Sequence, residues 1–341
     1  MLRNLRFSDL RFLAAWVLPG LTLLNVTQDP AHVAVGAAAI WVLVASIDAW
    51  WPGANRSPAP VGPAPALTWV LRLYVVLQAL ILAAGLVAAR NADWSVVVAL
   101  AFAVGFVTGA QGITFAHELG HSRVKSDRAL AWLLMTSVNY SHFMVEHYRG
   151  HHPRAATFDD SATARRGESL WRFLPRTLGG SFVSAWRLEA QRLRQFRRSW
   201  LTSPLAWAWG VNAIAVAVLA GAAEWKMLAF WLGQCAFAIW LLETVNYIEH
   251  YGLQRGVDAN GQREPFGMPH AWNADHVVSN SLLANLQRHS DHHTHAWKPF
   301  PELEALPGPQ LPTGYAGCLL LATVPPLWFR LMEKRLSAAG V

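Results

Sequence analysis

Histidine is concentrated in one part of this chain, at spacings that suit metal binding. Of the fourteen histidines, nine fall in four short clusters. The clusters read His-Glu-Leu-Gly-His at residues 117–121, Glu-His-Tyr-Arg-Gly-His-His at 146–152, Glu-His-Tyr-Gly at 249–252 and Arg-His-Ser-Asp-His-His at 288–293. Neutral imidazole is the commonest metal ligand in proteins. A metal centre is therefore the first chemistry to consider.

Spacing within the clusters brings the rings together on helix faces. His117 and His121 are four residues apart, so both side chains lie on one helix face about one turn apart. The other members repeat this spacing or follow an apolar run: His147, His151, His152, His250, His289, His292 and His293. Nine imidazoles are enough for two metals of four or five ligands each, whereas a catalytic zinc uses about three protein ligands. Without a metal, each buried ring would need a hydrogen-bond partner in an apolar region.

The identity of the metal stays open on spacing alone, because imidazole suits zinc, copper, iron and nickel. His-Glu-x-x-His alone fits a zinc protease with Glu118 as general base, but that leaves six histidines unexplained. A metal or haem transporter would need ligands strung along a path across the bilayer. Ligating imidazoles usually donate their second N–H to a carboxylate or carbonyl, and five acidic residues near the clusters are candidates for that role: Glu118, Glu146, Asp160, Glu249 and Asp291. Five histidines do not fit the pairing and are expected outside the centre: His32, His142, His270, His276 and His295.

The composition places these clusters beside a membrane. Charged residues make up only 14% of the chain, against about 25% in typical soluble domains, and hydrophobic residues reach 53%. The eighteen tryptophans suit membrane–water interfaces. The net charge of +7 comes from basic residues between apolar runs, which argues against nucleic-acid binding. The two cysteines, Cys235 and Cys318, form no Cys-x-x-Cys pair.

The apolar runs predict an all-α integral membrane protein, because about 20 apolar residues as helix cross the hydrocarbon core. We expect one domain over residues 1–341. Its six spans are predicted at 12–28, 30–47, 68–89, 94–117, 199–223 and 227–248, with a helical cap at 118–198 and 249–341 that carries the metals. Glu243 lies inside the last span, where an acidic side chain should face the bundle interior.

Charge asymmetry predicts the orientation. The turns between paired spans hold only Arg90 and Lys226, whereas residues 123–198 carry fourteen Lys or Arg. By the positive-inside rule, we expect an inner-membrane protein with both termini, the cap and the active site in the cytoplasm. The apolar run 129–145 is predicted to be a buried or re-entrant helix, because a seventh span would separate the histidine clusters. The run 305–329 is expected to be a membrane-hugging tail, and the proline-rich stretch 51–66 a linker.

These motifs resemble those of the integral-membrane alkane 1-monooxygenases. The segment Asn-Tyr-Ile-Glu-His-Tyr-Gly at 246–252 is the most specific part, because it separates this group from ordinary membrane fatty-acyl desaturases. The resemblance implies a six-span bundle whose nine clustered histidines hold two iron ions. It implies terminal hydroxylation of n-alkanes with O₂, with electrons from a separate rubredoxin and its NAD(P)H-dependent flavin reductase. Hydroxylation of an aromatic methyl group such as that of xylene, or desaturation or decarboxylation of a fatty acid, is the alternative. Ser122 departs from a lysine that is common in the family.

The n-alkane implied by the resemblance has no polar group, so the shape of the binding channel must select it. We expect an apolar channel open to the bilayer, with walls one helical turn from the ligands. Ile113 and Thr114 precede His117, and Asn246 and Ile248 precede His250. Three tryptophans near the end of the second span are predicted to limit chain length: Trp41, Trp50 and Trp51. The arginine-rich segment 149–198 is a candidate docking surface for an acidic rubredoxin.

Overall fold

The computed structural model describes residues 7–51, 59 and 64–340. These residues form helices and loops, with two isolated β-bridges and no longer strand, which confirms the predicted all-α class. Most of the predicted linker at 51–66 lies outside the described residues.

Six helical segments in the described part of the chain are long and apolar enough to cross a membrane, as predicted. They are η1 with α1 (Phe7–Trp16 and Val17–Gln28), α2 (Val33–Trp50), α3 (Thr68–Asn91), α4 with η2 and α5 (Trp94–Val107, Thr108–Ile113 and Thr114–His121), α10 (Pro204–Gly221) and α11 (Trp225–His250). The fourth segment continues one turn past the predicted end, so both His117 and His121 are helical. The fifth begins later than predicted, because Ser203 caps its first turn and Pro204 occupies the first helical position.

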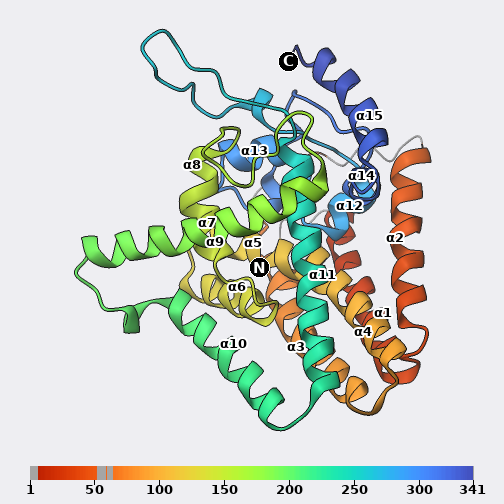
Figure 1. Cartoon of the computed structure of the whole chain (residues 1–341). Coiled ribbons are helices and arrows are strands. Elements are labelled where there is room, and N and C mark those ends of the chain that lie inside the picture. Colours follow the sequence, from red (N-terminus) through yellow and green to blue (C-terminus); the bar gives the residue numbers. More distant parts are fainter. Residues whose placement is uncertain (1–6, 52–58, 60–63, 341) are drawn as a thin grey trace.

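Helices α4 and α11 form the centre of the bundle (Figure 1). Two glycines permit their close contact. A Cβ added at Gly105 would lie 2.7 Å from the carbonyl oxygen of Gln234, and one at Gly109 would lie 2.7 Å from the Cα of Ala238. Because α5 continues α4, this contact fixes His117 and His250 at the same end of the bundle. Helix α10, by contrast, is mostly exposed, as expected of a helix that faces lipid.

The predicted run 129–145 is not a seventh span. Helix α6 (Lys125–Ser137) has thirteen residues, about 20 Å, which is shorter than the hydrocarbon core of about 30 Å. It packs against α5 and is followed by a turn, and the chain then continues through α7 (Phe143–Glu146), η3 (His147–His151) and α8 (His152–Arg154). This path of the chain brings the second histidine cluster next to the first.

An amphipathic helix, α9 (Leu170–Gln195), lies across the bundle at the histidine end (Figure 1). The chain beyond α11 covers the same end with η5 (Met268–His270), α12 (Val277–Leu282), α13 (His289–Thr294), η6 (Phe300–Glu302), α14 (Tyr315–Ala322) and α15 (Pro325–Ala338). The predicted tail 305–329 contains α14, which packs against α2 and α11. Trp41 on α2 donates a 2.9 Å hydrogen bond from Nε1 to the carbonyl of Ala316. This part of the tail is therefore inside the fold and does not merely lie along its surface.

Candidate metal centre

All nine clustered histidines converge on one region, where their ring nitrogens form two groups. The first group contains five histidines: His117, His121, His147, His152 and His292. The second contains four: His151, His250, His289 and His293. Within each group the possible ligand atoms all lie within 4.8 Å of one another. Each group draws on helices from distant parts of the chain, and the neighbours His151 and His152 belong to different groups.

The nitrogens of each group are spaced as ligands of a shared ion would be. Nε2 of His152 lies 3.0 Å from Nε2 of His147 and 3.2 Å from Nε2 of His121. In the second group, Nε2 of His289 lies 3.2 Å from Nε2 of His250. Metal–nitrogen bonds of about 2.0–2.1 Å at tetrahedral to octahedral angles place ligand nitrogens about 2.9–3.4 Å apart.

One buried ring nitrogen of the first group also lacks a hydrogen-bond partner among the described residues. Nε2 of His292 accepts or donates no hydrogen bond among the described residues, although His292 is almost fully buried. An orphaned polar atom at such a site calls for an unseen partner. An all-imidazole donor set with this spacing fits transition metals such as iron or zinc.

Burial keeps the rings in the ligating form. The pKa values of His147, His152 and His293 lie well below the usual range, because burial penalises the charged ring and because neighbouring imidazoles add repulsion. The same causes lower the pKa values of His289 and His292. Metal binding requires neutral imidazole. Because these rings are already neutral near neutral pH, they can bind an ion without first releasing a proton.

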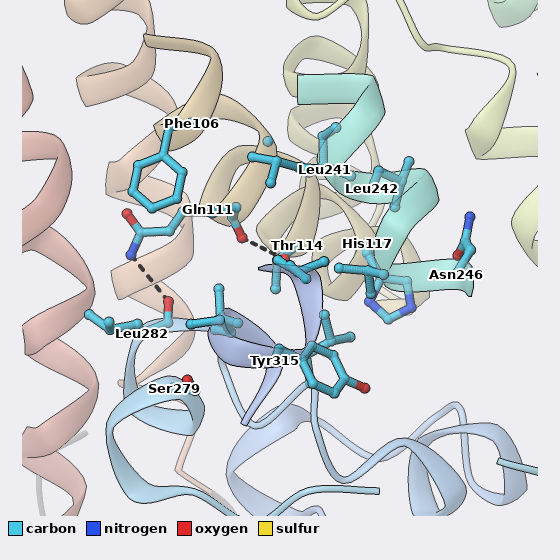
Figure 2. Close-up of a pocket in the computed structure, with 18 of the residues that line it drawn as sticks. Phe106, Gln111, Thr114, His117, Leu241, Leu242, Asn246, Ser279, Leu282 and Tyr315 are labelled. Carbon is cyan, nitrogen blue, oxygen red and sulfur yellow. Dashed lines mark hydrogen bonds between the residues drawn. The ribbon is translucent and has the colours of Figure 1, made fainter. Parts of the chain in front are cut away.

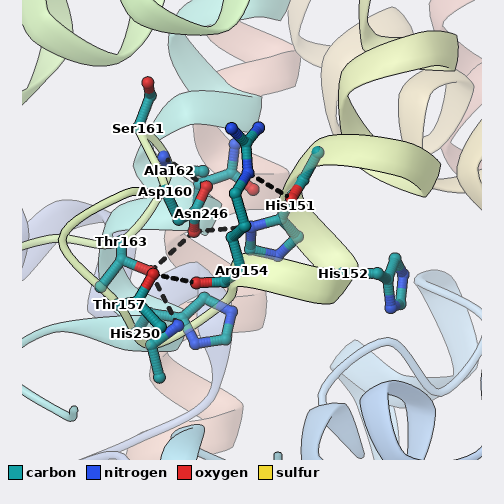
Figure 3. Close-up of polar contacts among 12 residues, drawn as sticks. His151, His152, Arg154, Thr157, Asp160, Ser161, Ala162, Thr163, Asn246 and His250 are labelled. Carbon is teal, nitrogen blue, oxygen red and sulfur yellow. Dashed lines mark hydrogen bonds and ion pairs between the residues drawn. The ribbon is translucent and has the colours of Figure 1, made fainter. Parts of the chain in front are cut away.

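Asp160 orients one histidine of the four-membered group (Figure 3). Its Oδ2 lies 2.9 Å from Nδ1 of His151 and accepts a 2.6 Å hydrogen bond from the hydroxyl of Thr163. Burial raises the pKa of Asp160, but the contacts with His151 and Thr163 outweigh burial and bring it down to about 2. The carboxylate is therefore charged, and it holds the proton of His151 on Nδ1 so that Nε2 points into the group.

Two further oxygen atoms lie close to histidines of the four-membered group. Oε1 of Glu249 lies 3.2 Å from Nδ1 of His289 and accepts a 2.8 Å hydrogen bond from the hydroxyl of Tyr315. Nδ1 of His250 lies 3.1 Å from the carbonyl oxygen of His270. The carbonyl contact escaped sequence analysis, because every residue has a carbonyl and no residue type marks it.

The other three candidate carboxylates have different partners among the described residues. Glu118 accepts a 2.9 Å hydrogen bond from the backbone N–H of Phe300, and Glu146 forms a 2.6 Å ion pair with Arg154. Asp291 binds His295 and Lys298. All three sit beside a histidine in sequence, but successive residues of a helix point in different directions, and their carboxylates serve the surrounding structure.

Glu243 faces the bundle interior, as predicted. Its side chain is buried, and it accepts 2.7 Å hydrogen bonds from the hydroxyls of Tyr140 and Thr177 and a 3.2 Å bond from the Asn246 amide. Four histidines expected outside the centre belong to neither group: His32, His142, His276 and His295. His270 contributes only its carbonyl.

A largely apolar cavity of about 90 Å³ ends on the histidines (Figure 2). Its lining includes members of both groups: His117, His147 and His289. Four of the predicted channel residues line it: Trp41, Ile113, Thr114 and Asn246. Three others do not line it. Trp50 and Trp51 are exposed beyond the end of the cavity-lining part of α2, and Ile248 is buried in the core.

The polar side chains along this cavity are bonded to the protein, as Figure 2 shows for two of them. Thr114 donates from its hydroxyl to the carbonyl of Ala110 at 2.7 Å. Gln111 donates from Nε2 to the carbonyls of Ala15 and Leu282 at 2.8 and 3.1 Å. These bonds turn the donors away from the cavity, which therefore presents mostly hydrocarbon and aromatic surface in front of the imidazoles.

Comparison with known proteins agrees with this arrangement. Residues 92–319 match the fatty acid desaturase family. Alkane 1-monooxygenase 1 of Pseudomonas aeruginosa is 40% identical over 270 residues, which cover 77% of this chain and 70% of that protein. The chain belongs to the alkane 1-monooxygenase family. It is therefore an oxidoreductase of the monooxygenase class.

Two other relatives of this chain have names that give different substrates. The alkane 1-monooxygenase of Ectopseudomonas oleovorans is 42% identical over 259 residues, covering 74% of this chain and 63% of that protein. The hydroxylase component of xylene/toluene monooxygenase of Pseudomonas putida is 30% identical over 240 residues, covering 68% and 62%. The chain thus spans between about three fifths and seven tenths of the length of these relatives.

The geometry disfavours the two other classes considered from the sequence. A zinc protease would use His117, His121 and a free Glu118, but Glu118 is hydrogen-bonded to Phe300 and both histidines share their group with three more. A transporter would place ligands at several depths. Here the nine histidines form two groups, and the elements that carry them, α5, η3, α8, α13 and the last turn of α11, meet at one end of the bundle (Figure 1).

Proposed function

We propose that the nine histidines hold two iron ions and that the protein hydroxylates the terminal methyl group of medium- or long-chain n-alkanes. The reaction consumes one O₂, two electrons and two protons, and it yields the 1-alkanol and water. The iron pair supplies the capacity to activate O₂ when bound. The observation that supports this proposal best is the apolar cavity that ends on His117, His147 and His289.

The protein's own residues select and place the substrate. A methyl group cannot be recognised by hydrogen bonds. Contact with Trp41, Phe106 and the leucines of α11 must therefore align the alkane with the histidines. The apolar wall also excludes water from the reacting carbon. The five imidazole nitrogens of one group and the four of the other would hold the two irons, and the irons would supply the activation of O₂.

The two histidine groups differ in their exposure and in the side chains next to them. The five-histidine group is more crowded, and His121 in it lines a solvent-facing hollow together with Tyr148. In the four-histidine group, Asp160 is hydrogen-bonded to His151, and Glu249 lies 3.2 Å from Nδ1 of His289.

We further propose that a separate rubredoxin delivers the electrons and that an NAD(P)H-dependent reductase reduces it. Exposed arginines on and after α9 offer a basic surface at the histidine end: Arg172, Arg187, Arg194, Arg197 and Arg198. Together with the scarcity of basic residues at the opposite end, they support an inner-membrane protein whose termini, cap and active site face the cytoplasm.

Iron content and product analysis test the proposal together. The protein is purified anaerobically, its iron and zinc are quantified, and it is assayed on octane, dodecane, toluene and a fatty acid with added rubredoxin and reductase. We expect two irons per chain and 1-alkanols as the main products. One zinc without iron would overturn the metal assignment. Benzyl alcohol from toluene, or an unsaturated acid or a hydrocarbon one carbon shorter from the fatty acid, as the preferred product would assign the sibling reactions instead.

A further inference from the structure

A basic hollow of about 590 Å³ opens beside the first histidine group, outside the apolar cavity. Four arginines line it: Arg123, Arg128, Arg149 and Arg192. They face one carboxylate, Glu189, which pairs with Arg149 at 3.2 Å and with Arg192 at 2.7 Å. The hollow therefore keeps a marked excess of positive charge and is suited to an anion.

A second hollow, of about 580 Å³ and largely apolar, lies between α3, α6, α10 and α11. Its walls include Leu86, Leu133, Val211, Leu219 and Trp231. It follows α10 from Pro204 to Leu219, a rise of about 22 Å. One leaflet contributes only about 15 Å to the hydrocarbon core, so this groove is long enough for the acyl chains of one leaflet.

The two hollows adjoin each other, because Trp132 and Pro204 line both. Trp132 thus stands where the basic lining gives way to the apolar lining, as tryptophan does at a membrane interface. We propose that this composite site binds an anionic phospholipid, with the phosphate among the arginines and the acyl chains in the groove along α10. Arginine recognises phosphate oxygens through charge-assisted hydrogen bonds, and basic pockets between membrane helices bind anionic headgroups.

The groove is the feature that favours a lipid over an acidic protein. A soluble electron donor would use the arginines but leave the apolar wall of Leu133 and Val211 uncovered. In the described part of the chain these two side chains are strongly exposed. The proposal does not depend on the reaction performed at the histidines.

Lipid retention tests the site directly. The full-length protein is exchanged into nanodiscs of phosphatidylcholine with a minor fraction of phosphatidylglycerol of the same acyl chains. Tightly bound lipid is then measured by native mass spectrometry after detergent extraction. The test variant is Arg123→Gln with Arg128→Gln, and the matched control is Arg172→Gln with Arg187→Gln, which removes the same charge from exposed positions on α9. A third variant, Ala215→Trp, fills the groove.

We expect the wild type and the α9 control to retain phosphatidylglycerol in preference to phosphatidylcholine. Each lost arginine should weaken retention roughly fivefold, so the double test variant loses most of the bound lipid. Ala215→Trp should also lose it, whereas glycerol phosphate, which has no acyl chains, should neither compete with the lipid nor raise the melting temperature. Equal retention of both lipids, or equal loss in the α9 control, overturns the proposal. If the test variant keeps its lipid but shows a raised KM for rubredoxin, the arginines serve the donor protein and the lipid assignment is wrong.

Discussion

Replacing Asp160 with asparagine is the sharpest test of the metal centre. Oδ2 of Asp160 accepts hydrogen bonds from His151 and Thr163, and Oδ1 accepts one from the backbone N–H of Ala162. All three partners are donors. In either orientation, the amide group of an asparagine at position 160 would therefore point N–H groups at another donor, and the negative charge beside His151 would be lost.

The expected loss follows from the contacts. Hydrogen bonds to a charged group contribute about 1.5–3 kcal/mol, and replacing the partner of a ligating histidine typically weakens metal affinity by about 10–100-fold. The two ranges agree, because about 1.4 kcal/mol is a tenfold change. Only the group that contains His151 is affected directly, so Asp160→Asn should lose one of the two irons at chelator concentrations that leave the wild type loaded.

The assay is iron retention against a graded chelator, followed by alkane hydroxylation. Glu118→Gln is the control, because Glu118 also adjoins a ligand in sequence but accepts its hydrogen bond from Phe300, and glutamine can still accept it. We expect this control to keep both irons and its activity within about threefold, a difference of about 0.7 kcal/mol. The reasoning is refuted if Asp160→Asn holds iron as firmly as the wild type, or if Glu118→Gln loses as much. Abolished activity with retained metal in the control would revive Glu118 as a general base.

Three further predictions concern substrate length, acid stability and electron delivery. Trp41→Ser removes an indole that lines the cavity. Turnover of longer alkanes should therefore rise about tenfold relative to octane, which corresponds to relieving about 1.4 kcal/mol of steric exclusion. The matched control is Trp50→Ser, at an exposed position, and an unchanged product profile in Trp41→Ser would show that Trp41 does not limit substrate length. Burial raises the pKa of Glu189, but Arg192 and Ser203 outweigh it and lower the pKa from 4.5 to about 2. The stabilising contribution of the Glu189 carboxylate is therefore complete above about pH 4.5 and is lost as the pH falls toward 2. Glu189→Gln should lower the free energy of unfolding by about 1–3 kcal/mol at pH 7, and the stabilities of the variant and the wild type should converge in acid. Thermal unfolding measured across pH would show this. If the exposed arginines of α9 attract rubredoxin, the KM for rubredoxin should rise with ionic strength, while turnover with an uncharged chemical reductant stays constant. A KM that does not depend on salt would show that these arginines do not guide rubredoxin and serve only to orient the protein in the membrane.

The sequence by itself predicted the histidine centre and the six spans of this protein, because both depend on local patterns. The number and position of the apolar runs depend on the length of helix that crosses a bilayer, so six spans were predictable and are present. The short spacing of the histidines placed rings on common helix faces. The expectation that the clusters share one site also required the run 129–145 to stay on one side of the membrane, and α6 is only thirteen residues long.

Only the tertiary structure decided how these parts combine. Adjacent histidines such as His151 and His152 separate into different groups, because group membership depends on which distant helix each ring faces. Five carboxylates looked alike in sequence, yet Asp160 and Glu249 reach a histidine of the centre while Glu118, Glu146 and Asp291 bind elsewhere. The tail helix α14 closes one wall of the cavity through contacts with α2 and α11. These outcomes depend on contacts between residues far apart in the chain, and no local spacing encodes them.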